Sequence, residues 1–233
     1  MSAQAACDCF YVDGRYVIEE GEEETYDCMT VTSRGLLIIE ATLTLNGYYC
    51  TSTVAGWVLL TDQAATLGFA ATHIVGGGGE IRGLKDTAQI TITSGAILSS
   101  TTTITGHLEI TGEGNFNNQG TVDADATGTL AIKVGGTVDD SDGDDRWRVS
   151  TSGATLLFDS AIGTLASMEG EFIVSAGVIY IDEALTTTGR LDLSGGVVDV
   201  GQNTTMGDQD AERFLAMTGG EIKVAAGKTF THH

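Results

Sequence analysis

The chain has 233 residues and carries 11 Lys and Arg against 32 Asp and Glu, a formal net charge of −21 at pH 7. Hydrophobic residues make up 42% and charged residues 18%, a balance that excludes an intrinsically disordered chain. The excess of negative charge argues against nucleic acid as a partner, because its phosphate backbone is also negative, and no apolar run is long enough to insert into a membrane.

The N-terminal segment holds all four cysteines, Cys7, Cys9, Cys28 and Cys50. Cys7, Cys28 and Cys50 are 21 and 22 residues apart, so they can stack on neighbouring turns of a repeating fold. We expect structural disulfides, with at least one bond joining Cys28 to Cys7, Cys9 or Cys50. Inert thiols and a metal cluster are the alternatives, although a zinc site of four cysteines normally contains a pair separated by two residues, which is absent here.

One pattern recurs along most of the chain: a glycine, any residue, an apolar residue, any residue and a second apolar residue. Clear copies begin at Gly14, Gly35, Gly56, Gly106, Gly128 and Gly177, and with the imperfect copies the glycines are 21 to 27 residues apart. Another register, at Gly170, Gly196 and Gly220, shows that each repeat of about 24 residues holds at least two short strands. We expect the glycines to supply positive φ at the corners.

Strands this short cannot form a core alone, but stacked repeats bury a continuous apolar column. The sequence therefore predicts an all-β protein, a single-stranded parallel β-helix (β-solenoid) of nine or ten coils with acidic surface loops. Residues 1–34 should form a cysteine-containing cap with the first coil, and residues 35–233 the solenoid. A β-sandwich or meander is the alternative, but it gives no reason for a constant repeat. The inward column should contain Leu37, Val58, Leu108, Leu130 and Ile179.

Runs such as residues 34–47, where apolar and other residues alternate after a glycine, resemble those of right-handed parallel β-helix (β-solenoid) proteins of cell surfaces and virions. Such proteins include phage tailspikes, adhesins, polysaccharide lyases and glycoside hydrolases. The resemblance concerns the fold, and no catalytic motif can be transferred to this chain residue by residue.

Two acidic stretches, residues 19–24 and 139–145, interrupt the repeat and should form surface loops. In the second, Asp140, Asp142 and Asp144 alternate, as the oxygen ligands of a calcium loop often do. They form a candidate Ca²⁺ site, and a solvated hairpin is the alternative. We expect no other cofactor.

We find no cluster of catalytic residues and expect a non-catalytic structural subunit of a larger assembly. The first residues lack the basic and apolar stretches of a secretory signal, which favours a virion component such as a tail fibre, tailspike or capsid decoration protein at the virion surface. A secreted cell-surface adhesin or filament subunit is the second hypothesis, and a polysaccharide lyase or glycoside hydrolase the third. Expected partners are other copies of the chain or other structural subunits, with a surface glycan as a further candidate.

Overall fold

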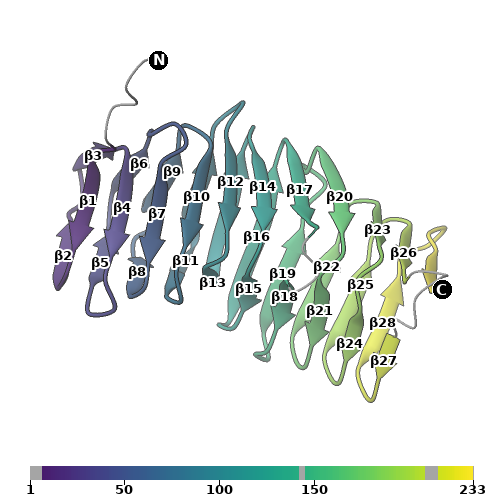
Figure 1. Cartoon of the computed structure of the whole chain (residues 1–233). Coiled ribbons are helices and arrows are strands. Elements are labelled where there is room, and N and C mark those ends of the chain that lie inside the picture. Colours follow the sequence, from purple (N-terminus) through teal and green to yellow (C-terminus); the bar gives the residue numbers. More distant parts are fainter. Residues whose placement is uncertain (1–6, 142–144, 208–214, 233) are drawn as a thin grey trace.

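The computed structural model describes residues 7–141, 145–207 and 215–232, and all regular structure in these residues is β. Short strands wind around one axis and stack from the N-terminal to the C-terminal end (Figure 1). Each strand pairs in parallel with strands of the neighbouring turns. The fold is the predicted parallel β-solenoid. The described residues contain no helix able to cross a membrane.

Three faces surround the axis, and we call them the A, B and C faces. The A face is an eleven-stranded sheet with one strand from each turn. Ten steps lead from its first strand to its last, in agreement with the nine or ten coils expected. Its strands are β1 (Cys9–Val12), β4 (Cys28–Val31), β7 (Thr51–Val54), β10 (His73–Gly76), β12 (Ile97–Ser100), β14 (Asn115–Asn118), β17 (Thr137–Asp140), β20 (Thr164–Met168), β23 (Leu185–Thr187), β26 (Thr204–Met206) and β29 (Phe230–His232).

The B face follows the A face in each turn, and the C face completes the turn. The B face contains β2 (Arg15–Ile18), β5 (Leu36–Ile39), β8 (Trp57–Leu60), the first parts of β11 (Glu80–Ile92) and β13 (Thr103–Gly112), β15 (Thr121–Ala124), β18 (Arg146–Val149), β21 (Glu171–Val174), β24 (Leu191–Leu193) and β27 (Leu215–Met217). The C face contains β3 (Glu23–Tyr26), β6 (Thr42–Leu45), β9 (Thr66–Phe69), the second parts of β11 and β13, β16 (Gly128–Val134), β19 (Ala154–Phe158), β22 (Val178–Ile181), β25 (Val197–Val200) and β28 (Glu221–Val224).

The five core residues expected in one column are all buried, but they occupy two columns. Leu37 pairs with Val58 on the B face. Leu108 pairs with Leu130 on the C face, and that column reaches Ile179 through β19. The prediction of a single column was wrong, because the glycine pattern marks any strand that follows a corner and each turn has three corners.

The glycines serve two purposes, of which the sequence suggested one. Gly106 and Gly177 have positive φ, as expected. Gly56 and Gly79 do not, yet a Cβ on either would lie 2.2 Å from a backbone oxygen of the preceding turn. At this corner the repeated glycine is required because neighbouring turns approach too closely for a side chain.

Two disulfides connect the first three turns. Cys9 is bonded to Cys28, with 4.4 Å between their Cα atoms, and Cys7 to Cys50, with 6.2 Å. The first bond confirms the predicted link between Cys28 and another of the four cysteines. All four cysteines are paired, so no thiol remains to act as a metal ligand in this state.

Candidate functional site

The outward side chains of the A face are almost all uncharged. Asp139 is the single charged one among the outward strand positions that the structure describes. The described outward residues are Tyr11, Thr30, Thr51, Thr53, Ile74, Gly76, Ile97, Ser99, Asn115, Asn117, Thr137, Asp139, Thr164, Ala166, Thr186, Thr205 and Thr231, together with the disulfide-bonded Cys9 and Cys28. Hydroxyl and amide groups therefore dominate this face.

These polar groups form rows along the solenoid because successive strands are in register. Thr186, Thr205 and Thr231 are paired in succession on β23, β26 and β29. Ser99 pairs with Asn117 on β12 and β14. Adjacent strands are about 4.8 Å apart, so the A face presents a donor or acceptor at nearly every step over about 48 Å.

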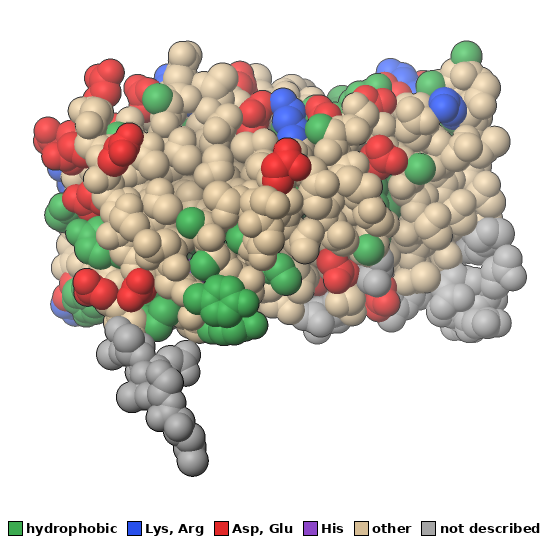
Figure 2. All heavy atoms as spheres, turned by 90° about the horizontal axis from the view of Figure 1, so that it is seen from above, with side chains coloured by type: hydrophobic (Ala, Val, Ile, Leu, Met, Phe, Trp, Pro, Cys, Tyr) green, Lys and Arg blue, Asp and Glu red, His purple; other side chains and the backbone are tan. Residues whose placement is uncertain are grey.

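The outward side of the B face carries many charges. They are Arg15, Glu80, Arg82, Asp123, Arg146, Arg148, Glu171, Arg190 and Asp192. Arg82 binds both carboxylate oxygens of Asp125, at 2.9 and 3.0 Å, and Arg146 lies 3.6 Å from Glu171 on the next turn. The charges of this face are therefore largely paired between turns. Figure 2, a view from above, shows acidic side chains in separate groups among wide uncharged areas.

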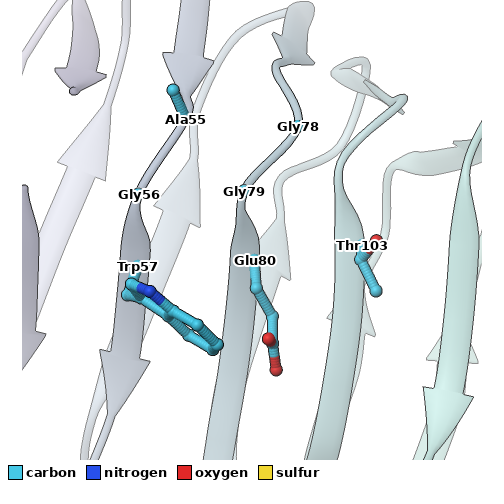
Figure 3. A pocket seen from close by; sticks show the side chains of 7 residues that line it. All are labelled: Ala55, Gly56, Trp57, Gly78, Gly79, Glu80 and Thr103. Atoms are coloured by element: carbon cyan, nitrogen blue, oxygen red, sulfur yellow. The ribbon is translucent and has the colours of Figure 1, made fainter. Parts of the chain in front are cut away.

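A groove of about 350 Å³ lies where the chain passes from the A face to the B face. Trp57, Glu80 and Thr103 line it, together with Gly56, Gly78 and Gly79. Figure 3 shows the Trp57 side chain reaching from β8 toward Glu80 on β11. The indole is 50% exposed, whereas Trp147, the other tryptophan, is fully buried.

Sequence reasoning missed Trp57 as a candidate functional residue. It occupies a variable position of the glycine pattern, directly after Gly56, and alternation predicts that such a position points outward. An aromatic residue at an outward position was the available signal, because tryptophan is enriched at binding surfaces, where it offers a large apolar body together with a polar N–H.

The predicted calcium site is only partly within the described residues. Asp142 and Asp144 lie outside them. Asp140, the last residue of β17, is buried, and its carboxylate accepts hydrogen bonds from the Trp147 indole N–H and the Glu169 backbone N–H. Burial raises the pKa of Asp140 to about 7, although these donors oppose the shift. The calcium site stays a prediction.

A serine and a histidine lie together in the core beneath the A face. The Ser52 hydroxyl oxygen is 2.6 Å from Nε2 of His73 and accepts a hydrogen bond from the Met29 backbone N–H. Both side chains are fully buried, and burial lowers the pKa of His73 to about 4. The contact gives the Ser52 hydroxyl and Nε2 of His73 a polar partner within the core, and the burial of both side chains keeps them from contact with a substrate.

Comparison with protein-family models, with curated proteins and with solved structures found no match to this chain. The function is therefore inferred from the surfaces of the molecule alone.

Proposed function

We propose that the protein is a non-catalytic structural subunit that packs through its A face against other copies of itself or against other structural subunits. The neutrality of this face is the observation that supports the proposal. In a chain with a net charge of −21, eleven strands present one charged outward side chain among the described residues.

Electrostatics favour this face over the others for contact. Two copies of so acidic a protein repel each other, and burying charged groups carries a further desolvation penalty. Both terms are smallest where charged side chains are absent. Ile74 and Ile97, which are 48% and 38% exposed on neighbouring strands β10 and β12, add apolar contact area.

The dimensions of the A face allow a specific but modest interface. A length of about 48 Å and a strand width of about 13 Å give about 600 Å² per copy. Two such faces would bury about 1,200 Å², at the lower limit for a specific complex. An interface of this size suits an assembly in which many subunits act together, because repeated weak contacts reinforce one another.

The setting we favour is the surface of a virion, with a tail fibre, tailspike or capsid decoration protein as the form of the subunit. Two disulfides support an oxidising environment. A secreted adhesin or filament subunit would share this environment and use the same face.

Sedimentation velocity over a series of salt concentrations tests the proposal. Association of the wild-type chain should increase with salt, because screening weakens repulsion between subunits. Thr137→Glu, on the A face, should weaken association by about tenfold or more, an effect of roughly 1.4 kcal/mol. Thr121→Glu is the matched control, since it adds the same charge at the first position of a B-face strand.

A wild-type chain that stays monomeric at every salt concentration would contradict the proposal, as would equal effects of the two variants. A monomer that also releases reducing or unsaturated sugars from a panel of polysaccharides would support a polysaccharide-cleaving enzyme instead.

A further inference from the structure

The Trp57 side chain lies at a boundary on the B face. Its register neighbours are Leu36 on β5 and Glu80 on β11. Ile38 and Leu59 form the parallel outward row beside it on β5 and β8. On the N-terminal side of the indole the surface is therefore apolar, and on the other side it is charged. A ligand that covers the indole meets both kinds of surface.

Glu80 is held in place so that part of its carboxylate remains available. The Arg82 guanidinium donates to Oε1 at 3.0 Å, and the Thr105 hydroxyl donates to the same oxygen. Arg82 is itself fixed by its two bonds to Asp125. No hydrogen bond from a described residue reaches Oε2 of Glu80, so this oxygen can accept one from a ligand without moving the side chain.

The glycines keep the groove open. A side chain at Gly79 would collide with the carbonyl oxygen of Gly56, so the stacking of turns itself excludes one. Gly78 has no atom within 4 Å of the place where a Cβ would lie, so the space above it is empty of protein. Between Trp57 and Thr103 a ligand therefore meets the Glu80 side chain and the backbone of the corner glycines.

We propose that this groove binds a neutral pyranose unit of a glycan. A pyranose ring has an apolar C–H face that can cover the exposed indole and hydroxyl groups that can donate to Oε2 of Glu80, a charge-assisted hydrogen bond. The Thr103 hydroxyl can either donate or accept. A volume of about 350 Å³ is at the lower end of small-ligand sites, which suits one or two sugar units.

The charge of the site selects against acidic sugars. Glu80 would face a uronate or sulfate group, and Arg82 cannot compensate because Glu80 and Asp125 already bind it. The net charge of −21 adds long-range repulsion. The ligand class is therefore neutral. The proposal does not depend on assembly through the A face, which lies beside the groove and uses other residues.

Tryptophan fluorescence gives a direct test, because Trp57 is half exposed while Trp147 is buried. Quenching by acrylamide should report mainly on Trp57. We expect at least one oligosaccharide from a neutral panel of gluco-, manno- and galacto-oligosaccharides to protect Trp57 from quenching in a saturable manner. Oligogalacturonate, the acidic control, should give no protection. The absence of protection by every neutral oligosaccharide, or protection by the acidic one alone, would overturn the proposal.

Titration calorimetry with the best neutral oligosaccharide identifies the residues. Trp57→Ala should weaken binding by about tenfold or more, and Glu80→Gln by a few fold because it keeps the shape and loses the charge. Tyr11→Ala removes an aromatic side chain that is 65% exposed on β1 of the A face and is the matched control. Circular dichroism checks that each variant is folded.

Binding to Trp57→Ala as tight as to the wild type would refute the site, and so would an equal loss in Tyr11→Ala. The fluorescence measurement uses the unmodified chain, so the proposal remains testable even if a variant fails to fold.

Discussion

The A and B faces enclose the same core but differ on their outer sides. Val75 and Leu98 on the A face, and Val58 and Ile81 on the B face, are all essentially fully buried. Outside, the A face shows rows of hydroxyl and amide groups with Asp139 as its one charge among the described strand positions, while the outward strand positions of the B face carry eight charges. Alternation in a strand fixes the inner side chains and leaves the outer ones free to specialise.

The charges of the B face connect one turn to the next. Glu171 on β21 lies 3.6 Å from Arg146 and 3.7 Å from Arg190, on the turns before and after it. Exposed pairs of this kind contribute little each, about 0–1 kcal/mol. The comparison indicates that the B face uses its polar side chains within the molecule, whereas the A face leaves most of its hydroxyl and amide groups for contacts outside it.

The largest expected loss of stability comes from a substitution in the core, which the A and B faces share. Leu130→Asp places a charge in the fully buried core of the C face, at an expected cost of more than about 4 kcal/mol. The variant should fail to fold, as measured by circular dichroism and thermal melting. Thr129→Asp, at the outward position before it, is the control, and equal damage from both would show that position 130 is not in the core.

Removing the disulfides should loosen the first strands of the A face and leave later strands of both faces intact. For sequence separations of 19 and 43 residues, the loss of chain-entropy restraint amounts to about 3 and 4 kcal/mol. Paired Ser substitutions at Cys9 and Cys28, or at Cys7 and Cys50, compare the two bonds by hydrogen exchange in β1 and β4. Four free thiols in non-reducing mass mapping would contradict the pairing.

The buried carboxyl of Asp140, at the end of the A-face strand β17, should make the stability of the protein depend on pH. Its pKa in the folded protein, about 7, lies above the ordinary value of 3.8, so the folded state holds this proton more tightly than the unfolded state does. The stabilisation is complete below about pH 4 and is lost as the pH rises through 7, a change of at most about a few kcal/mol. Asp140→Asn should flatten this part of the stability curve, measured by denaturant unfolding in a calcium chelator. An unchanged curve would rule out a raised pKa.

A smaller loss of stability should distinguish the paired from the unpaired charges of the B face. Arg82→Met removes a half-buried bidentate pair with Asp125 and should cost about 1 kcal/mol, less at high salt. Arg15→Met is the control, because no described residue forms an ion pair with Arg15. Equal losses in the two variants, by denaturant unfolding, would show that the ion pairs add nothing.

The smallest expected effect is a change of melting temperature on addition of Ca²⁺, through the acidic segment that follows β17. If Asp140, Asp142 and Asp144 hold Ca²⁺, the ion should raise the melting temperature, because it binds the folded state alone. Asp142→Ala should remove the increase. A melting temperature that does not respond to Ca²⁺ leaves a solvated acidic loop.

The sequence by itself determined the fold class. Strands of four residues with strict alternation, repeated about every 24 residues after a glycine, allow few arrangements other than stacked parallel turns. The spacing of the cysteines likewise predicted a bond between Cys28 and one of the other three, and the structure shows that Cys9, on the adjacent strand, is this partner. These features are local or recur at a nearly regular spacing, so they can be read along the chain.

Only the tertiary structure decided which residues share a face. The number of residues per turn varies, so the pattern could not place Leu37 and Leu108 in different columns. The neutrality of the A face and the groove lined by Trp57 and Glu80 could not be predicted for the same reason, since the residues concerned lie a turn or more apart in sequence. Such surfaces arise from register between turns, and that register is set by how the core side chains and corner glycines of each turn pack on the turn before it.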